Sequence, residues 1–207
     1  MRIAALSLAL ALLAPALSAQ EQEQEFERPS DWIVRFDRGG QPDDIYFVEM
    51  PPGWHVTTGP AAILYDPART AQGNYGVESQ IYLFPVERRE AFGVFIGGTD
   101  LDGSGQAYTY FLIRKDGSFL IKERTGGETR VLHPWTMHEA IVKHDGGEGT
   151  AKNLLAIDVG GETVRFMVNG EEVASMPRDE LRTEGIVGLR VNHGLNVHVS
   201  SLEVTSK

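Results

Sequence analysis

Cysteine is absent from this sequence. Without it the chain has no disulfide framework, no cysteine nucleophile and no attachment point for the N-terminal lipid of a bacterial lipoprotein. Basic residues are also scarce, with 19 Lys and Arg against 29 Asp and Glu, which gives a formal net charge of −10. No nucleic acid partner is therefore expected, because binding a polyanion requires a concentrated basic surface.

The only long hydrophobic run lies at the N-terminus, in MRIAALSLALALLAPALSAQ, and it is too short for a comfortable membrane span. An early arginine, an apolar stretch from Ile3 to Leu13 and small residues after it are typical of a secretory signal peptide. We therefore predict a signal peptide at residues 1–19, a polar lead-in at 20–30 and no membrane span in the mature chain. Since disulfides are lacking, the predicted location is secreted or periplasmic, in a bacterium.

Helical periodicity is missing too, whereas alternating strands and turn dipeptides recur along the chain. The clearest region is NLLAIDVGGETVRFMVNGEEVASM, residues 153–176. There Gly160-Gly161 and Asn169-Gly170 predict two successive two-residue hairpin turns. A third hairpin joins AYTYFLIR to SFLIKER through Asp116-Gly117.

Further strands are predicted by the same patterns, and they are 32–37, 44–49, 61–65, 76–84, 91–97, 185–191 and 195–204. The last of them changes phase, which indicates a bulge near Ser200 and Ser201. A single helical turn is expected between Pro177 and Gly185. So many strands imply two packed sheets, and we predict one all-β domain over residues 31–207, a two-sheet antiparallel jelly-roll sandwich.

Four stretches follow one another in the second half of the chain: YTYFLIRKDGSFLI, NLLAIDVGGETVRFMVNGEEVASM, GIVGLRVN and VHVSSLEV. Their succession resembles the concanavalin A-like lectin/glucanase superfamily over residues 75–204, especially its laminin-G-like and 3-keto-disaccharide hydrolase (DUF1080) domains. The resemblance implies one convex and one concave sheet, with ligands often bound on the concave face or at its rim. These motifs are turn glycines and core alternation, so they indicate fold better than function.

The glucanase branch of that superfamily carries a Glu-x-Asp-x-x-Glu strand, and this chain has none. The nearest stretch, GVESQIY, has Glu78 but places Gln80 where the second carboxylate would stand. A retaining mechanism needs two carboxyl groups about 5 Å apart, so that activity is disfavoured. A Gly-x-Ser-x-Gly elbow is also lacking, and His138 and His144 are too far apart for a His-Glu-x-x-His zinc motif.

Two strands carry side chains suited to sugars. Alternation places Glu78, Gln80 and Tyr82 on one face of their strand, and Tyr108 and Tyr110 on one face of theirs. Aromatic rings stack on pyranose faces, while amides and carboxylates bind hydroxyls. The alternative is that these tyrosines pack between strands and hold their hydroxyls at the edge.

Other candidates lie near predicted strand ends. Asn192 and His193 precede the last strand, which carries His198, and they would suit hydroxyl binding or be ordinary exposed residues. Trp54 and His55, in a segment rich in Pro and Gly, would either line the rim of a groove or pin that segment to the core.

The stretch DLDGSG begins like a calcium loop, with Asp100 and Asp102 at the first and third positions. Phe111 stands at the twelfth position, where an EF-hand has a bidentate glutamate, and the flanks predict strands rather than helices. A turn between two strands therefore explains the loop better than a metal site. Calcium at Asp100 and Asp102 remains the alternative, and no other cofactor is expected.

Taken together, these features predict a non-catalytic carbohydrate-binding or interaction module whose partner is a glycan or cell-envelope component. The rival hypothesis is a glycoside-active hydrolase or lyase related to the 3-keto-disaccharide hydrolases. Its available acids, bases or ligands would be Glu78, Asp100, Asp102, His193 and His198. A purely structural envelope protein is the third reading.

Overall fold

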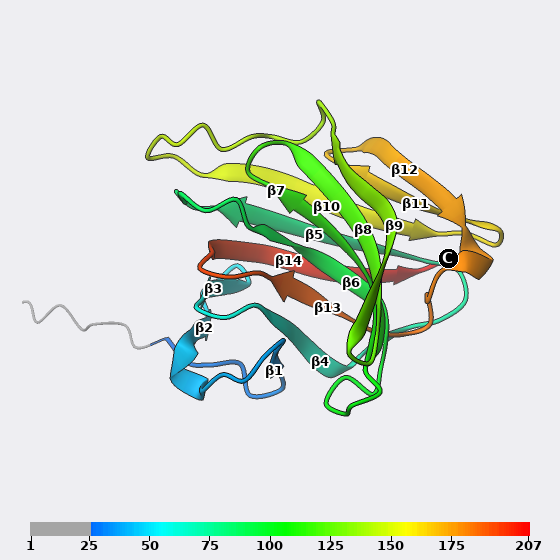
Figure 1. The fold of residues 1–207 in the computed structure, drawn as a ribbon, viewed down its shortest axis with the longest axis horizontal. Helices are drawn as coiled ribbons and strands as arrows, with labels where there is room; N and C mark the ends of the chain where they lie inside the picture. The colour runs from blue at the N-terminus through cyan, green and yellow to red at the C-terminus, as the bar shows by residue number, and fades with distance from the viewer. Residues whose placement is uncertain (1–25) are drawn as a thin grey trace, which may run out of the picture.

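The computed structural model describes residues 26–207, so the predicted signal peptide and the first part of the lead-in lie outside the described residues. The described chain forms two antiparallel sheets of seven strands each, packed face to face (Figure 1). This confirms the prediction of an all-β two-sheet sandwich. Between residues 26 and 207 no helix is long and apolar enough to cross a membrane.

Sheet A contains, from edge to edge, β1 (Ile33–Phe36), β4 (Ala62–Ala71), β13 (Gly185–Val191), β6 (Ala91–Thr99), β7 (Ala107–Arg114), β8 (Ser118–Thr125) and β9 (Glu128–Met137). Sheet B contains, in the same manner, β12 (Glu171–Pro177), β11 (Thr163–Val168), β10 (Ala151–Val159), β5 (Tyr75–Leu83), β14 (Asn196–Ser206), β3 (Trp54–Thr58) and β2 (Ile45–Glu49). Two short 3-10 turns, η1 (Pro42–Asp44) and η2 (Arg178–Glu180), precede β2 and β13.

The core lies between the two sheets and follows from the alternation along each strand. On β7, Phe111 and Ile113 point inward, and the Phe111 ring meets the Phe166 ring of β11 edge-on at 5.4 Å between centroids. On β5, Val77 and Ile81 point inward in the same way. Alternate residues consequently face outward, on the outer face of each sheet.

The outer face of sheet A is unusual because it is buried although no further layer of strands covers it. Eight residues there form a second apolar cluster: Ile63, Tyr65, Ala91, Phe95, Leu101, Tyr108, Tyr110 and Leu112. Part of this cover comes from the β6–β7 loop, which contributes Leu101 to the cluster. Outward residues of sheet B such as Tyr46, Glu78 and Lys152, by contrast, are exposed.

Most strand predictions are confirmed within a few residues, as are the bulge between Val199 and Ser201 and the helical turn after Pro177. The prediction of a two-residue turn is correct at Asn169-Gly170, where both residues have positive φ. At Gly160-Gly161 it is wrong, because Glu162 also belongs to the loop. The stretch DLDGSG connects β6 to β7, as expected from its strand-like flanks.

Two strands were not predicted. β3 begins at Trp54, directly after the segment rich in Pro and Gly. β9 is an edge strand with irregular pairing to β8, and it contains Pro134, which an edge strand tolerates because it need not donate to a neighbour.

Candidate functional site

The structure divides the predicted sugar-binding residues between the outer faces of the two sheets. Gln80 and Tyr82 lie on the outer face of sheet B, whereas Tyr108 and Tyr110 lie on the outer face of sheet A. The alternation predicted for each strand is confirmed, because Val77, Ile81 and Leu83 on β5 and Phe111 and Ile113 on β7 are core residues. The two sets cannot contact one ligand, because the whole thickness of the sandwich separates them.

On sheet A the two tyrosines are buried, Tyr108 being 0% and Tyr110 4% exposed. Their rings lie 5.5 Å apart, and the Arg190 guanidinium lies 5.0 Å from the centre of the Tyr110 ring. Burial raises the pKa of Tyr110 to about 12 against the opposing charge of Arg190, so its phenol stays neutral at physiological pH. Their burial leaves little ring surface on which a ligand could stack.

Arg190 is the central polar residue of this face and was not among the predicted site residues. It is only 6% exposed, and its two terminal nitrogens donate to Asp37 at 2.9 and 2.5 Å, one of them also reaching the Tyr108 hydroxyl at 3.1 Å. A fork-to-fork pair of this kind fixes both groups in place. The alternation of GIVGLRV already points Arg190 away from the core, which is the sequence signal that could have identified it.

Two further cations of β8 stand beside this pair. Arg124 lies 3.7 Å from the Asp37 carboxylate, and Lys122 lies close enough to Arg124 and Arg190 for their charges to lower its pKa, after the larger effect of burial. We name the sheet A polar cluster by its six residues: Asp37, Tyr108, Tyr110, Lys122, Arg124 and Arg190.

The carboxylate of the cluster is ionised. Burial by itself would raise the pKa of Asp37, but the hydrogen bonds and charge of Arg190, with the charges of Arg124 and His193, lower it below 3.8. The cluster opens to solvent at its edge, since the side chain of Asp37 is 22% and that of Arg124 13% exposed.

The predicted residues of the β13–β14 connection lie at the rim of this face. His193 lies near Asp37, and its Nδ1 is 3.9 Å from the Glu90 carboxylate. The side-chain oxygen of Asn192 is buried and has no hydrogen-bond partner within residues 26–207. The structure therefore brings His193, Tyr108 and Tyr110 to one face of the molecule.

The outer face of sheet B carries a separate cavity of about 520 Å³. Its lining comprises Pro52, Gln80, Tyr82, Phe84, Thr150, Leu154, His198, Ser200 and Ser201. The Gln80 amide donates to the Tyr82 hydroxyl at 3.0 Å and to the Ser200 hydroxyl at 2.8 Å, and Nε2 of His198 lies 2.9 Å from the Pro52 carbonyl oxygen. Because these polar groups bind one another, fewer of them remain to contact a ligand.

Glu78 and Trp54 lie outside that cavity. Glu78 lines a smaller cavity of about 310 Å³ further along β5, with Asp158 and Lys207. Trp54 packs against the core, 4.7 Å from the Trp32 ring, so of the two roles left open by the sequence it pins its segment to the core. The acids and bases of the hydrolase hypothesis thus do not line one cavity.

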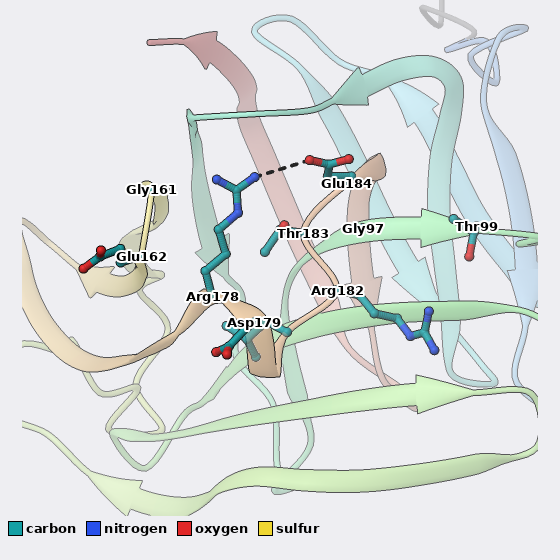
Figure 2. Close-up of a pocket in the computed structure, with 10 residues that line it drawn as sticks. Gly97, Thr99, Gly161, Glu162, Arg178, Asp179, Arg182, Thr183 and Glu184 are labelled. Carbon is teal, nitrogen blue, oxygen red and sulfur yellow. Dashed lines mark hydrogen bonds and ion pairs between the residues drawn. The ribbon is translucent and has the colours of Figure 1, made fainter.

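Another cavity, of about 680 Å³, lies where η2 joins β13 (Figure 2). Arg178 projects across it and pairs with Glu184 at 3.4 Å, as the dashed line in Figure 2 shows. The same guanidinium also donates to the carbonyl oxygens of Gly73 and Gly160 at 2.9 and 3.0 Å. Arg178 therefore ties loops together, and its guanidinium is already bound by acceptors of the protein itself.

The predicted metal residues lie in the β6–β7 loop. The Asp100 carboxylate accepts a hydrogen bond from the Gly105 amide at 2.8 Å, so it closes the loop on itself. Arg35 donates to the Leu101 carbonyl and, at 2.8 Å, to that of Gly103. Within the described part of the chain no three His, Asp or Glu side chains are grouped to hold a metal ion, and calcium gains no support.

No protein-family model and no curated protein matches the sequence, so the resemblance to 3-keto-disaccharide hydrolases stays a prediction. Solved structures do match. A carbohydrate-binding module, CBM66, from Bacillus subtilis aligns with a TM-score of 0.63 at 12% identity, covering 85% of this chain and 96% of its own. A family 16 glycoside hydrolase from Bacteroides ovatus, in complex with a mixed-linkage glucan product, gives 0.59 at 7% identity over 86% and 96%.

A β-glucanase from Bacillus licheniformis gives a TM-score of 0.58 at 12% identity, covering 87% of this chain and 94% of its own. Likeness at such low identity establishes architecture and leaves function open. With its two curved seven-stranded sheets, the chain has the concanavalin A-like lectin/glucanase fold, shared by carbohydrate-binding modules and glucanases.

Proposed function

We propose that this protein is a non-catalytic carbohydrate-binding module that binds its saccharide on the outer face of sheet A. The observation that carries the proposal is the sheet A polar cluster, an interlocked set of charged and phenolic groups on a face that no other layer covers. Ion pairs this deeply buried seldom stabilise a fold better than apolar side chains of similar volume would. Donors and acceptors held in fixed positions are, however, what recognition of hydroxyl groups requires.

An aromatic side chain extends this surface toward β9. Trp135 packs beside the apolar cluster of the outer face and remains partly exposed, and the Arg114 guanidinium lies 3.4 Å from its ring centre. Rings held in this way present a rigid apolar surface beside polar groups, and such a surface suits the mixed character of a pyranose.

The charge state of Asp37 favours binding over catalysis. A retaining or inverting glycosidase needs two carboxyl groups, one of them protonated to act as an acid. Asp37 is the only carboxylate of the sheet A polar cluster, and its pKa is lowered rather than raised. Similarity in fold to a module named for carbohydrate binding supports the same reading.

Affinity electrophoresis in native gels that contain mixed-linkage glucan, xylan, alginate or polygalacturonate would test this proposal. We expect at least one polysaccharide to retard the protein. Arg124→Gln should reduce the retardation about tenfold, because it removes a charged hydrogen-bond donor from the exposed edge of the cluster.

Tyr82→Ala is the matched control, because it removes an aromatic residue from the opposite face and should leave retardation unchanged. Loss of binding in Tyr82→Ala with full binding in Arg124→Gln would move the site to the cavity of sheet B. If none of the four polymers retards the protein, the proposed function is wrong.

A further inference from the structure

The sheet A polar cluster carries an excess of positive charge. It contains three cations, Lys122, Arg124 and Arg190, but only one carboxylate, Asp37. The protein as a whole has the opposite balance, with a formal net charge of −10. Composition alone therefore does not explain why cations gather on this face.

Lys122 is the cation without a counter-charge. Among residues 26–207 no carboxylate lies within ion-pair distance of its ammonium group, and no hydrogen bond joins it to the protein. Arg190 and Arg124 oppose its charge, and partial burial removes some of the water that would solvate it. Holding a lysine in this position costs stability unless an anion offsets the repulsion.

The neighbouring groups are already fixed. Arg190 is held by Asp37 and Tyr108, although its buried Nε has no hydrogen-bond partner in the described part of the chain. Arg124 donates to the carbonyl oxygen of Gly126 at 3.1 Å and lies 3.7 Å from Asp37. The single carboxylate of Asp37 thus neutralises only one of the three positive charges. An anionic ligand could neutralise the other two.

We infer that the saccharide bound on the outer face of sheet A is acidic, and that Lys122 and Arg124 hold its carboxylate. The inference rests on the proposed function and specifies the substrate class of the same site. A uronate residue supplies both required parts, a carboxylate for the cations and a pyranose ring with hydroxyls for Asp37 and the surface near Trp135. The charge of Asp37 in turn disfavours a ligand made only of closely spaced anions.

Isothermal titration calorimetry with polygalacturonate oligosaccharides and with the same oligosaccharides after reduction of their carboxyl groups would test the inference. We expect the acidic form to bind about tenfold more tightly, because a charge-assisted hydrogen bond contributes roughly 1.5 kcal/mol or more. Lys122→Gln should weaken binding of the acidic form far more than binding of the reduced form, and so remove most of that difference. Lys143→Gln, at an exposed lysine of the β9–β10 connection, should change neither.

Equal binding of acidic and reduced oligosaccharides would overturn the inference and leave the proposed function intact. If Lys143→Gln weakened binding as much as Lys122→Gln, the attraction would be non-specific and the inference would again fail. Binding of poly-glutamate as tight as that of polygalacturonate would assign the site to acidic peptides instead. If neither oligosaccharide binds and none of the four polymers retards the protein, both the proposed carbohydrate binding and the inferred acidic ligand are wrong.

Discussion

At the scale of single residues, the two buried tyrosines of sheet A differ in one hydrogen bond. The Tyr108 hydroxyl accepts from Arg190 at 3.1 Å, whereas the Tyr110 hydroxyl has no hydrogen-bond partner within residues 26–207. We expect Tyr108→Phe to lower the free energy of unfolding by about 1 to 2 kcal/mol, since the lost bond has a charged donor. Tyr110→Phe keeps the ring beneath Arg190 and should cost less than about 0.5 kcal/mol.

Urea unfolding followed by tryptophan fluorescence would measure both variants. Equal losses of the free energy of unfolding in the two variants would contradict this expectation. They would show that the hydroxyl bonded to Arg190 contributes no more to stability than the hydroxyl of Tyr110. The comparison is well matched, because the two residues lie on the same strand, two positions apart, and both are buried.

Single residues also show how far the sequence could predict the site. Alternation correctly assigned Tyr108 and Tyr110 to one face, and it also points Arg190 outward. The partner of Arg190 was not predictable, because Asp37 lies 153 residues away and follows an edge strand. Pairing at that separation is set by strand order, which local patterns do not reveal.

At the scale of elements, two glycine turns in the β10–β11–β12 meander look alike in sequence but differ in structure. Gly170 has φ of +87°, while Gly161 lies outside the left-handed region, and a Cβ at either position would meet no atom within 4 Å. Gly170→Ala should therefore destabilise the protein by about 1 kcal/mol through backbone strain alone. Gly161→Ala should be neutral or stabilise by up to about 1 kcal/mol, because it restricts the unfolded chain.

Thermal denaturation of the two variants would check this expectation. A loss of melting temperature in Gly161→Ala comparable to that in Gly170→Ala would contradict it, since no steric contact distinguishes the sites.

The elements missed by the sequence share a physical reason. β3 follows a run rich in Pro and Gly, and such a run usually marks a loop. β9 has most of its residues exposed, so its apolar and polar residues do not alternate cleanly as they do on β7 or β10. The alternation of apolar and polar residues predicts strands that bury one face. The position of an edge strand depends instead on the neighbouring strand with which it pairs.

At the scale of the whole molecule, stability should fall in acid through three carboxylates. The pKa of Asp37, Asp116 and Asp158 is below the ordinary 3.8 in the folded state. For Asp158 the hydrogen bond from Lys207 is the main cause. For Asp116 burial is the largest single effect and would raise the pKa, but the hydrogen bonds from Ser118 and Arg89, with the charge of Arg89, together outweigh it. The contribution of the three carboxylates is complete above about pH 5, where both folded and unfolded chains are ionised.

As the pH falls below 3.8, the unfolded chain takes up protons first, so this contribution declines and disappears once the folded groups titrate. Urea midpoints measured between neutral pH and pH 2 should therefore drop mainly below pH 4. Asp158→Asn should show a smaller drop than the unmodified protein. A drop in the urea midpoint centred near pH 6 would contradict this prediction, because it would indicate that histidines and not carboxylates cause the loss of stability.

The strand order of the whole molecule also explains why the two sets of predicted sugar-binding residues, one on β5 and one on β7, do not form one site. Face alternation says which side chains of a strand lie together, but not to which of two sheets that strand belongs. β5 and β7 join different sheets, so residues that seemed to form one sugar-binding surface lie on opposite sides of the sandwich.

The strand order has a consequence for how the protein is made. β13 lies between β4 and β6 in sheet A, and β14 lies between β5 and β3 in sheet B, so strands near the C-terminus occupy the middle of both sheets (Figure 1). Until residues 185–206 have been synthesised, each sheet remains in two halves that have no hydrogen bonds to each other. Neither sheet can therefore be completed before residues 185–206 are made, and the sandwich depends on pairing between strands far apart in the sequence, which slows folding.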